Sequence, residues 1–285
     1  MIPTFLNVEI DSTYQFSAIG KDEDMNVIED LTFAWTSTSL AVGTIDQNGL
    51  FATKSLGTTF ISAKSGSTES EQVEVNVYES VFITDIDNNI YKIVKIGEQW
   101  WMAENLKVTH YSNGDPIPNV RDDTAWLNLT SGAYCDYNNN YSNGDTYGHL
   151  YNWAAVDDNR GLASEGWHIP TDEEWKELEI YLGLSESDYY IWGHRGTDEG
   201  TKLKSTYGWN NNGNGTNIYG FAALPGGHRY FDEFTSIGQL GGWWSSTIAD
   251  ASNNSFVRGL FNGFSGIHRS DGDWQSGFSV RCIKD

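Results

Sequence analysis

The sequence predicts a protein of two domains, an all-β sandwich followed by a larger β-rich domain with few helices. Residues 1–79 contain short runs in which apolar and polar side chains alternate at regular spacing, which is typical of the strands of a sandwich. The whole chain has 30 glycines, 12 tryptophans and 15 tyrosines, a composition typical of short strands and long ordered loops. Its 285 residues are enough for two ordinary domains.

The charge of the chain excludes two classes of partner. Its 39 acidic and 17 basic residues give a net charge of −22, which repels nucleic acids and anionic membrane surfaces. We therefore expect no nucleic-acid partner. The acidic residues are scattered, so we interpret them as a soluble surface, with Ca²⁺ binding as the alternative. No apolar run is long enough to span a membrane, so no membrane insertion is expected.

The expected strands of the first domain follow one another at short intervals. The run 32–36 places Phe33 and Trp35 on one face, as expected for a half-buried strand. Asn48-Gly49 is a strong hairpin signal, because these residues favour the backbone of a tight turn. The expected strand segments are 5–10, 13–18, 32–36, 44–52, 58–63 and 72–77.

Three segments of this domain resemble the bacterial immunoglobulin-like domains of group 2. They are Trp35-Thr36-Ser37, the run 45–51 and the closing run 73–77. The resemblance implies an all-β Ig-like sandwich over residues 1–79, which in that family is mostly a spacer or an adhesive stalk. Glu79-Ser80 is the expected linker to the second domain.

The second domain begins with a predicted hairpin over 81–97, in which two alternating runs flank Asp87-Asn88-Asn89. The spacing Asp85-x-Asp87-x-Asn89 is also that of the start of a Ca²⁺-binding loop. The segment lacks the glycine and the distal glutamate of an EF-hand, so a β-turn is the preferred interpretation. The adjacent Trp100 and Trp101 cannot share one face of a strand, so one of them is expected in the core.

The clearest helix signal lies in the middle of the second domain. Thr171 and Glu174 form a capping box, and the apolar residues that follow fall on one face of a helix over about 172–182. A second helix is expected over 147–156. The asparagine-rich and glycine-rich run 210–215 is expected to be a surface loop.

The C-terminal segment 241–285 is predicted to carry a binding surface. Both ends, 241–247 and 277–283, mix aromatic, β-branched and small residues and are expected to be buried sheet. The centre, 248–275, is rich in Asn, Asp, Ser and Gly with scattered aromatics, and is expected to be irregular and exposed. Rigid aromatics among adaptable polar residues are typical of binding surfaces.

The candidate ligand-binding residues all lie in this centre. For Phe256 and Phe261 the alternative is a place in the core of a strand. A sugar ring can stack on an aromatic side chain while Asn and Asp bind its hydroxyls, and a protein ligand can use the same surface. The full set is Phe256, Arg258, Phe261, Phe264, His268, Arg269, Asp271, Asp273, Trp274 and Gln275.

Six motifs of the second domain resemble the Fibrobacter succinogenes major paralogous domain, in that family's order. They are IGxxWWMAENL at 96–106, YGxLYNWAAV at 147–156, GWHIPTDEEW at 166–175, FAALPGG at 221–227, WSST at 244–247 and GFSVRC at 277–282. That family resembles the C-type-lectin-like and formylglycine-generating folds. The resemblance implies an α+β, C-type-lectin-like ligand-binding domain over residues 80–285.

The two cysteines, Cys135 and Cys282, are far apart in sequence and show no metal-ligand spacing. We expect a disulfide that ties the C-terminal segment to the loop after Tyr134. Two buried thiols in a reducing compartment are the alternative.

The sequence predicts no enzyme. The motifs HExxH and GxSxG are absent. The acidic run Asp172-Glu173-Glu174 opens a helix, where acids favour the helix dipole, and we interpret His168 as structural. Formylglycine-generating enzymes act through a close pair of cysteines in their C-terminal part. Only Cys282 lies in that part of this chain, so the resemblance does not carry their chemistry over.

The C-terminus is also similar to the variable region of lectin-fold proteins diversified by retroelements, because WSST at 244–247 and GFSVRC at 277–282 enclose a varied, polar centre. In those proteins the fixed ends hold the fold while the centre changes its ligand, as in bacteriophage tail adhesins and bacterial surface proteins. Lectin analogy leaves Ca²⁺ open as a cofactor. The motifs Glu-Pro-Asn, Gln-Pro-Asp and Trp-Asn-Asp are absent, so Ca²⁺-bridged sugar binding is not expected.

These observations predict a non-enzymatic, extracellular adhesin that binds a bacterial cell-surface glycan or protein. The alternative is a structural surface protein without a dedicated ligand. The run Met1-Ile2-Pro3-Thr4 lacks the basic and apolar regions of a signal peptide. The chain therefore either follows a removed signal or is released in another way, such as lysis that frees a virus particle. The expected location is a bacterial cell surface or a phage virion, and a homo-oligomer is left open.

Overall fold

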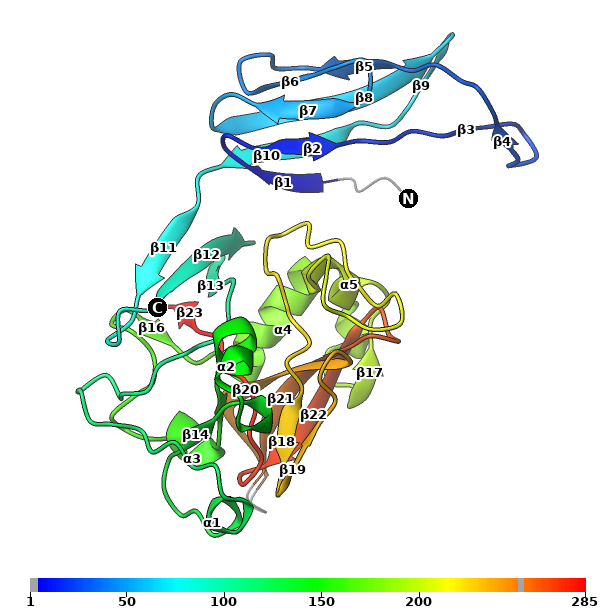
Figure 1. Ribbon diagram of the computed structural model, residues 1–285. Helices are drawn as coiled ribbons and strands as arrows, with labels where there is room; N and C mark the ends of the chain where they lie inside the picture. Colours follow the sequence, from blue (N-terminus) through cyan, green and yellow to red (C-terminus); the bar gives the residue numbers. More distant parts are fainter. Residues whose placement is uncertain (1–4, 251–253) are drawn as a thin grey trace. The chain divides into compact units, whose positions relative to one another are not determined.

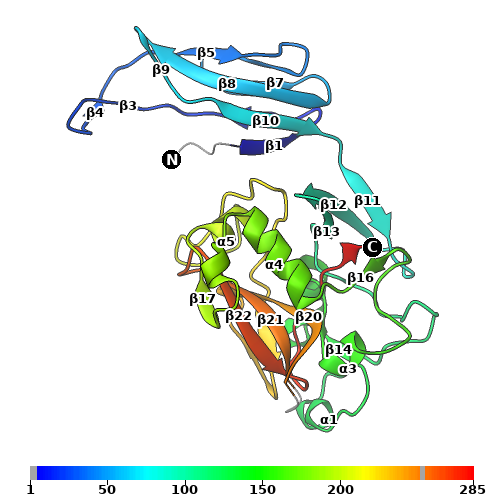
Figure 2. The same cartoon turned by 180° about the vertical axis from the view of Figure 1, so that it is seen from behind.

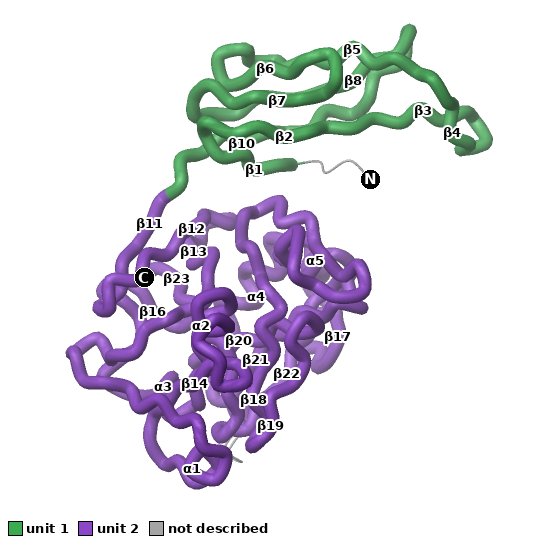
Figure 3. The backbone as a smooth tube through the Cα atoms, in the orientation of Figure 1, with its two compact units in different colours: residues 1–80 green, residues 81–285 purple. Residues whose placement is uncertain are grey.

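The computed structural model describes residues 5–250 and 254–285. The chain divides into two compact units, residues 1–80 and residues 81–285 (Figure 3). Each unit is described by itself.

The first unit contains two main sheets, as the alternating sequence pattern predicts. The larger sheet has the order β1 (Phe5–Glu9), β10 (Val73–Tyr78), β8 (Gly57–Ser65) and β5 (Ala34–Ser37), with β9 (Thr68–Glu69) paired to β8. The smaller sheet has the order β2 (Thr13–Gln15), β7 (Leu50–Thr53) and β6 (Gly43–Ile45). Alternate residues of β10 are buried, because one face of the strand lies on the core.

The hairpin predicted at Asn48-Gly49 joins β6 to β7. The Asp46 carboxylate accepts hydrogen bonds from the backbone N–H groups of Asn48 and Leu50, and Gly49 has a φ of 83° that favours glycine. The sequence reasoning missed a small hairpin of β3 (Gly20–Lys21) and β4 (Val27–Ile28). The strand expected over 13–18 ends at Gln15, and the strand expected over 32–36 is observed at Ala34–Ser37.

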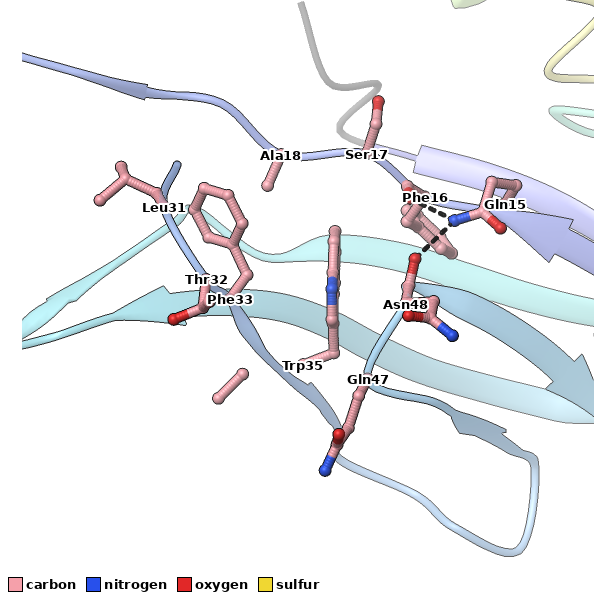
Figure 4. A pocket seen from close by; sticks show the side chains of 11 residues that line it. Gln15, Phe16, Ser17, Ala18, Leu31, Thr32, Phe33, Trp35, Gln47 and Asn48 are labelled. Atoms are coloured by element: carbon pink, nitrogen blue, oxygen red, sulfur yellow. Dashed lines mark hydrogen bonds between the residues drawn. The ribbon is translucent and has the colours of Figure 1, made fainter. Parts of the chain in front are cut away.

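An open hollow of about 670 Å³ lies at one end of the sandwich (Figure 4). Phe16, Phe33 and Trp35 line it, with the Phe16 and Trp35 rings 6.1 Å apart. Its polar lining is limited to Ser, Thr, Asn and Gln side chains and backbone groups among the described residues. It offers no charged group with which to recognise a ligand.

The second unit is built on two sheets joined by short helices and long loops (Figure 1). The first sheet has the order β11 (Val81–Thr84), β12 (Ile90–Ile96), β13 (Gln99–Met102), β23 (Ile283–Lys284) and β16 (Trp167–His168). The second has the order β17 (Gly193–Arg195), β22 (Ile267–Asp273), β21 (Asn254–Phe261) and β20 (Leu240–Asp250). Two further pairs are β14 (Tyr134–Cys135) with β15 (Leu150–Tyr151), and β18 (His228–Tyr230) with β19 (Glu233–Thr235).

The helices of this unit are short. The α-helices are α1 (Asp123–Leu127), α2 (Tyr141–Tyr147), α3 (Trp153–Val156), α4 (Asp172–Tyr181) and α5 (Glu199–Leu203). Two 3₁₀ turns, η1 (Tyr137–Asn139) and η2 (Glu186–Asp188), accompany them. Helix α4 lies against the β20–β22 sheet, with the Trp175 and Trp243 rings 6.3 Å apart (Figure 2).

Two local predictions for this unit are confirmed. The hairpin of β11 and β12 closes on a turn in which Asp85 accepts hydrogen bonds from the backbone of Asp87 and Asn89, so the acidic spacing serves a turn. Helix α4 begins with the predicted capping box, because Thr171 and Glu174 each bond the other's backbone N–H.

The predicted helix over 147–156 is wrong for its first half. Gly148 has a φ of 78°, which ends α2 at Tyr147, and the next residues form β15. Helix formation starts only after Asn152, whose side chain accepts a hydrogen bond from the backbone N–H of Ala155 and caps α3.

The centre of the C-terminal segment is also regular where the sequence predicted an irregular loop. Strands β21 and β22 pair antiparallel, from Asn254 with Asp273 to Gly259 with His268. Glycine is required for packing at Gly272, where a Cβ atom would come within 3.0 Å of the side chains of Val257, Phe278 and Trp244. Conversely, the end 277–283 is buried as expected but forms a strand only at Ile283, with isolated bridges before it.

Candidate functional site

The structure corrects the placement of two candidate residues. Arg258 and Arg269 are buried, with 1% and 4% of their surface exposed, and do not form a free binding surface. Both guanidinium groups contact the Asp172 carboxylate, Arg258 at 2.8 Å and Arg269 at 3.0 and 2.8 Å. Arg258 also donates to Glu179. These arginines lie on the face of the β21–β22 pair that packs on α4, so they are ion-paired structural residues.

Phe256 lies on the same face as the two arginines. The Arg269 guanidinium is 4.0 Å from the centre of its ring, and Trp192 packs beside it with ring centres 5.4 Å apart. Phe256 is therefore half-buried against its neighbours. The alternative interpretation of Phe256 as part of the strand core fits this position.

The opposite face of the sheet carries a groove of about 510 Å³. Residues of strands β20, β21 and β22 form its floor, and residues of the β18–β19 hairpin form a wall. Gly227, just before β18, is bridged to Gly241 of β20. Four of the candidate residues border the groove, namely Phe261, His268, Asp271 and Asp273. Phe261 and His268 face it, whereas the side chains of Asp271 and Asp273 lie on the face of Arg269, because Asp271 pairs with Phe256. The groove is the place where the structure brings predicted site residues together.

The remaining candidate residues do not line the groove. The Phe264 ring lies 4.4 Å from that of His194. Trp274 stacks near Trp153 and donates a hydrogen bond from Nε1 to Ser255 Oγ at 3.0 Å. Gln275 donates from Nε2 to the Leu127 carbonyl at 2.9 Å. These contacts give Trp274 and Gln275 structural roles at the rim of the sheet.

Aromatic residues that the sequence reasoning did not select line the hairpin side of the groove. Tyr230 is 54% exposed, and its ring centre lies 4.5 Å from that of Phe231. His228 stacks on Phe278 with ring centres 5.0 Å apart and planes inclined by 2°. The run of His228, Arg229, Tyr230 and Phe231 directly after Gly226-Gly227 was a local signal for this wall.

The groove is electrostatically neutral to acidic at neutral pH. Burial lowers the pKa of His228 to about 4. Burial also lowers the pKa of His268, and the neighbouring His194 and Arg195 lower it further. The nearby acids are Asp271, which is exposed, and Asp273, which accepts a hydrogen bond from the backbone N–H of Gln275, and both side chains lie on the opposite face of β22. Among the described residues that line the groove there is no lysine or arginine.

Comparison with known protein families identifies the second unit. The model of the Fibrobacter succinogenes major domain matches residues 94–284, more than half of the chain. The chain belongs to this family. A second model, the bacterial Ig-like domain of group 2, matches residues 2–75. The Fibrobacter succinogenes major domain therefore contains the whole groove, and both family resemblances seen in the sequence are confirmed.

No curated protein matches the chain. Among solved structures, the surface layer protein SbsC is 20% identical over 47% of this chain and 17% of that chain, with a TM-score of 0.26. The Yersinia pseudotuberculosis adhesin InvE is 13% identical over 99% of this chain and 95% of that chain, with a TM-score of 0.21. A GH10 xylanase with a bacterial Ig-like domain, from termite gut, is 13% identical over 30% and 21%, with a TM-score of 0.22.

The cysteines of the Fibrobacter succinogenes major domain are free, which corrects the expected disulfide. Cys135 and Cys282 are both buried. Cys135 packs with Trp126 and Leu150, whereas Cys282 belongs to a different cluster of buried residues. Burial raises the pKa of each thiol to about 12. The observed arrangement is the alternative of two buried thiols.

The acidic turn, His110 and His168 of the Fibrobacter succinogenes major domain have internal partners. Asp87 accepts hydrogen bonds from Thr109 and pairs with His110. His168 bonds Asp285 and Glu174, in line with its structural interpretation. In the part of the chain that the structure describes, no group of three or more His, Cys, Asp or Glu residues is placed to hold a metal ion. No helix of the described chain is long and apolar enough to cross a membrane.

Proposed function

We propose that this protein is a non-enzymatic adhesin of a bacterial surface, whose Fibrobacter succinogenes major domain binds a cell-surface ligand in the groove. The observation that carries this proposal is the groove itself, a hollow of about 510 Å³ with an exposed tyrosine on one wall and polar strand residues on its floor. Concave sites with aromatic walls and a few polar groups are typical of ligand pockets.

A rigid floor supports the proposal. Val257 and Gly272 face the groove between strands that pair in register, and the other side of the same sheet is held by the buried contacts of Arg258 and Arg269 with Asp172. A site that is already ordered loses little conformational freedom when a ligand binds. In this proposal the Ig-like unit acts as a spacer that carries the ligand-binding domain.

The polar groups of the groove support binding rather than catalysis. Nucleophilic catalysis by serine or histidine needs the two groups within hydrogen-bond reach. Ser276 Oγ and His228 Nδ1 are buried without a hydrogen-bond partner among the described residues. Ser276 and His228 are therefore not an assembled nucleophile and base in the described part of the groove, and we propose no enzymatic activity.

The fold class of the second domain and the diversification of its C-terminal segment are also proposals. We propose that the second domain is C-type-lectin-like and that the segment between WSST and GFSVRC is diversified by a retroelement in a phage tail adhesin or a bacterial surface protein. Strands β21 and β22 lie in this segment and supply much of the floor of the groove, so changes there would alter the ligand. A near-copy of the codons for 244–282 beside a reverse transcriptase gene would support this.

Binding to a panel of bacterial strains tests the proposal. Labelled wild-type protein is compared with a Tyr230→Ala, His268→Ala variant, both folded by circular dichroism. Tyr207→Ala is the matched control, because Tyr207 is 63% exposed and lies outside the groove. We expect the wild type and the control to bind some strains and the groove variant to bind none. Parallel samples with EDTA report whether Ca²⁺ contributes.

Equal binding by the groove variant would show that the groove is not the receptor-binding site. A wild-type protein that binds no strain would favour the second candidate, a structural surface protein in which the domain packs against its neighbours. In that case the wild type has no cell-binding activity, and the substitutions in the groove change only how the protein assembles on the cell surface.

A further inference from the structure

The charge of the groove restricts what it can bind. The titratable side chains that face it are His228, His268 and the exposed Tyr230, whereas Asp271 and Asp273 border it with side chains on the opposite face of β22. Both histidines have lowered pKa values, so both are neutral at pH 7. An anionic ligand would lose its hydration with no lysine or arginine of the described lining to pair with it. Uronic acids, sialic acids, phosphates and sulfates are therefore disfavoured.

The shape of the lining favours a flat, partly apolar ligand. Tyr230 and Phe231 present two rings on the hairpin wall, and Phe261 and Phe278 add aromatic surface next to the floor. His268 and Ser270 face the groove from β22 and offer polar atoms to hydroxyl groups. A hexose has an apolar face for stacking and hydroxyl groups at its edge, which matches this combination.

The backbone at Phe231 has a positive φ, which is unusual for a bulky residue. Strands β18 and β19 pair from Tyr230 with Glu233, so Phe231 is the first central residue of a two-residue turn. Its φ is 54°, a conformation that favours glycine at this position of a hairpin. A bulky side chain kept in a conformation that suits glycine is a feature of functional sites. Here the consequence is an aromatic ring beside Tyr230 on the wall of the groove.

We infer that the groove binds an uncharged hexose unit of a glycan, with the sugar ring stacked on the Tyr230–Phe231 wall and its hydroxyl groups bound on the β22 side. This inference rests on the proposed function and specifies its ligand class. The groove discriminates against acidic sugars, because its described lining presents no lysine or arginine side chain to pair with a carboxylate.

Calorimetric titration with matched sugars tests the inference on the full chain. The neutral probes are tetrasaccharides of glucose, galactose and mannose, the acidic probes are the corresponding uronic acid tetramers, and tetralysine represents a basic peptide. We expect at least one neutral tetramer to bind and its acidic counterpart to bind at least roughly tenfold more weakly. Ser270→Lys, which places a cation on the groove face of β22, is expected to narrow this difference.

The Phe231→Gly variant separates binding from folding. Glycine suits the positive φ, so we expect its melting temperature to be unchanged or raised, while the affinity for the neutral sugar falls by roughly tenfold because a stacking surface is lost. Phe264→Ala is the matched control, since it removes a ring outside the groove and should leave sugar affinity unchanged.

Four outcomes overturn the inference. Three of them are equal or tighter binding of an acidic tetramer, binding of tetralysine without binding of any sugar, and an unchanged affinity in Phe231→Gly. A wild-type protein that binds no sugar but still binds cells through the groove would overturn the sugar class and leave the proposed function standing. Cells bound equally well by the Tyr230→Ala, His268→Ala variant would instead overturn the proposed function.

Discussion

The Arg258 guanidinium donates a hydrogen bond from Nε to Glu179 Oε1 at 2.6 Å, and both side chains are buried. The other oxygen of the same carboxylate accepts from Arg195. Glu179 therefore joins helix α4 to β17 and β21, and Asp172 on the same helix joins it to β22 through Arg269. Two carboxylates of helix α4 thus bind the sheet that forms the floor of the groove, on the face opposite the groove.

Removal of the Glu179 charge should destabilise this sheet strongly. In Glu179→Gln the buried Arg195 guanidinium loses its carboxylate partner, whereas Arg258 keeps Asp172. An uncompensated buried charge costs about 3–5 kcal/mol of unfolding free energy. Urea unfolding followed by tryptophan fluorescence measures the loss. Glu98→Gln is the control, because Glu98 is an exposed partner of Lys95 and should change stability by less than about 1 kcal/mol. Equal losses in both variants would contradict the structural role of Glu179.

His168 should make stability fall as the pH rises. Burial lowers the pKa of His168, but its hydrogen bonds to Asp285 and Glu174 outweigh burial and leave the pKa above the ordinary 6.5. A raised pKa in the folded state means that protonation favours folding. The stabilisation is fully present below about pH 6.5 and is lost as the pH rises through the folded-state pKa.

Urea unfolding of the wild type and of His168→Gln across this pH range isolates the effect of His168. We expect the difference in unfolding free energy between the two proteins to be larger at about pH 6 than at about pH 8.5. A difference that is constant, or that grows with pH, would contradict the raised pKa.

The two thiols should be present but unreactive in the native protein. Cys135 and Cys282 are free and buried, and burial raises the pKa of each to about 12, so few thiolates exist at neutral pH. We expect a thiol reagent such as DTNB to label the native protein slowly and to label two thiols per chain after denaturation without reductant. Cys135→Ala should reduce the count to one. A denatured wild-type chain without reactive thiols would restore the disulfide hypothesis.

Gly49→Ala should destabilise the Ig-like unit. An alanine Cβ at this position would lie 2.6 Å from the Phe16 carbonyl oxygen and 3.0 Å from the Trp35 ring, and the positive φ adds about 1–2 kcal/mol of backbone strain. Gly66→Ala is the matched control, because Gly66 has a positive φ but open space around it. Calorimetry should show a larger loss for Gly49→Ala than for Gly66→Ala, and no loss of ligand binding in either.

Much of the fold follows from patterns that are local in the sequence. Strand β10 could be predicted because Val73, Val75 and Val77 alternate with polar residues, and the structure buries those three. Helix α4 could be predicted because the groups of its capping box are three residues apart. The six family motifs identified the second domain because the chain has them in the family's order.

The pairing of β21 with β22 could not be predicted because the buried positions that face α4 carry charged side chains. Arg258 and Arg269 indicate an exposed segment when the sequence is examined alone, yet their partners Asp172 and Glu179 lie on a helix distant in the chain. One local signal was available. Asp172 and Glu179 are seven residues apart on α4, next to the buried Trp175 and Leu178, so acidic residues occur on an apolar helix face.

The hairpin wall of the groove was missed for a related reason. Tyr230 and Phe231 lie outside the segment 248–275, and they reach the floor of the groove only through the pairing of β18 with β19 and the bridge from Gly227 to Gly241. Phe261, His268, Asp271 and the other candidate residues were selected by composition, which does not report which face of a strand a residue occupies.

Strands β1 and β10 of the Ig-like unit run parallel, from Phe5 with Glu74 to Glu9 with Tyr78. The described chain enters the unit at the start of β1 and leaves it after the end of β10, toward residue 81. Tension applied at these two points pulls neighbouring strands past each other in opposite directions, so the evenly spaced hydrogen bonds of the pair share the load. Rupture then requires many bonds to break at once, and the unit resists mechanical force along its length.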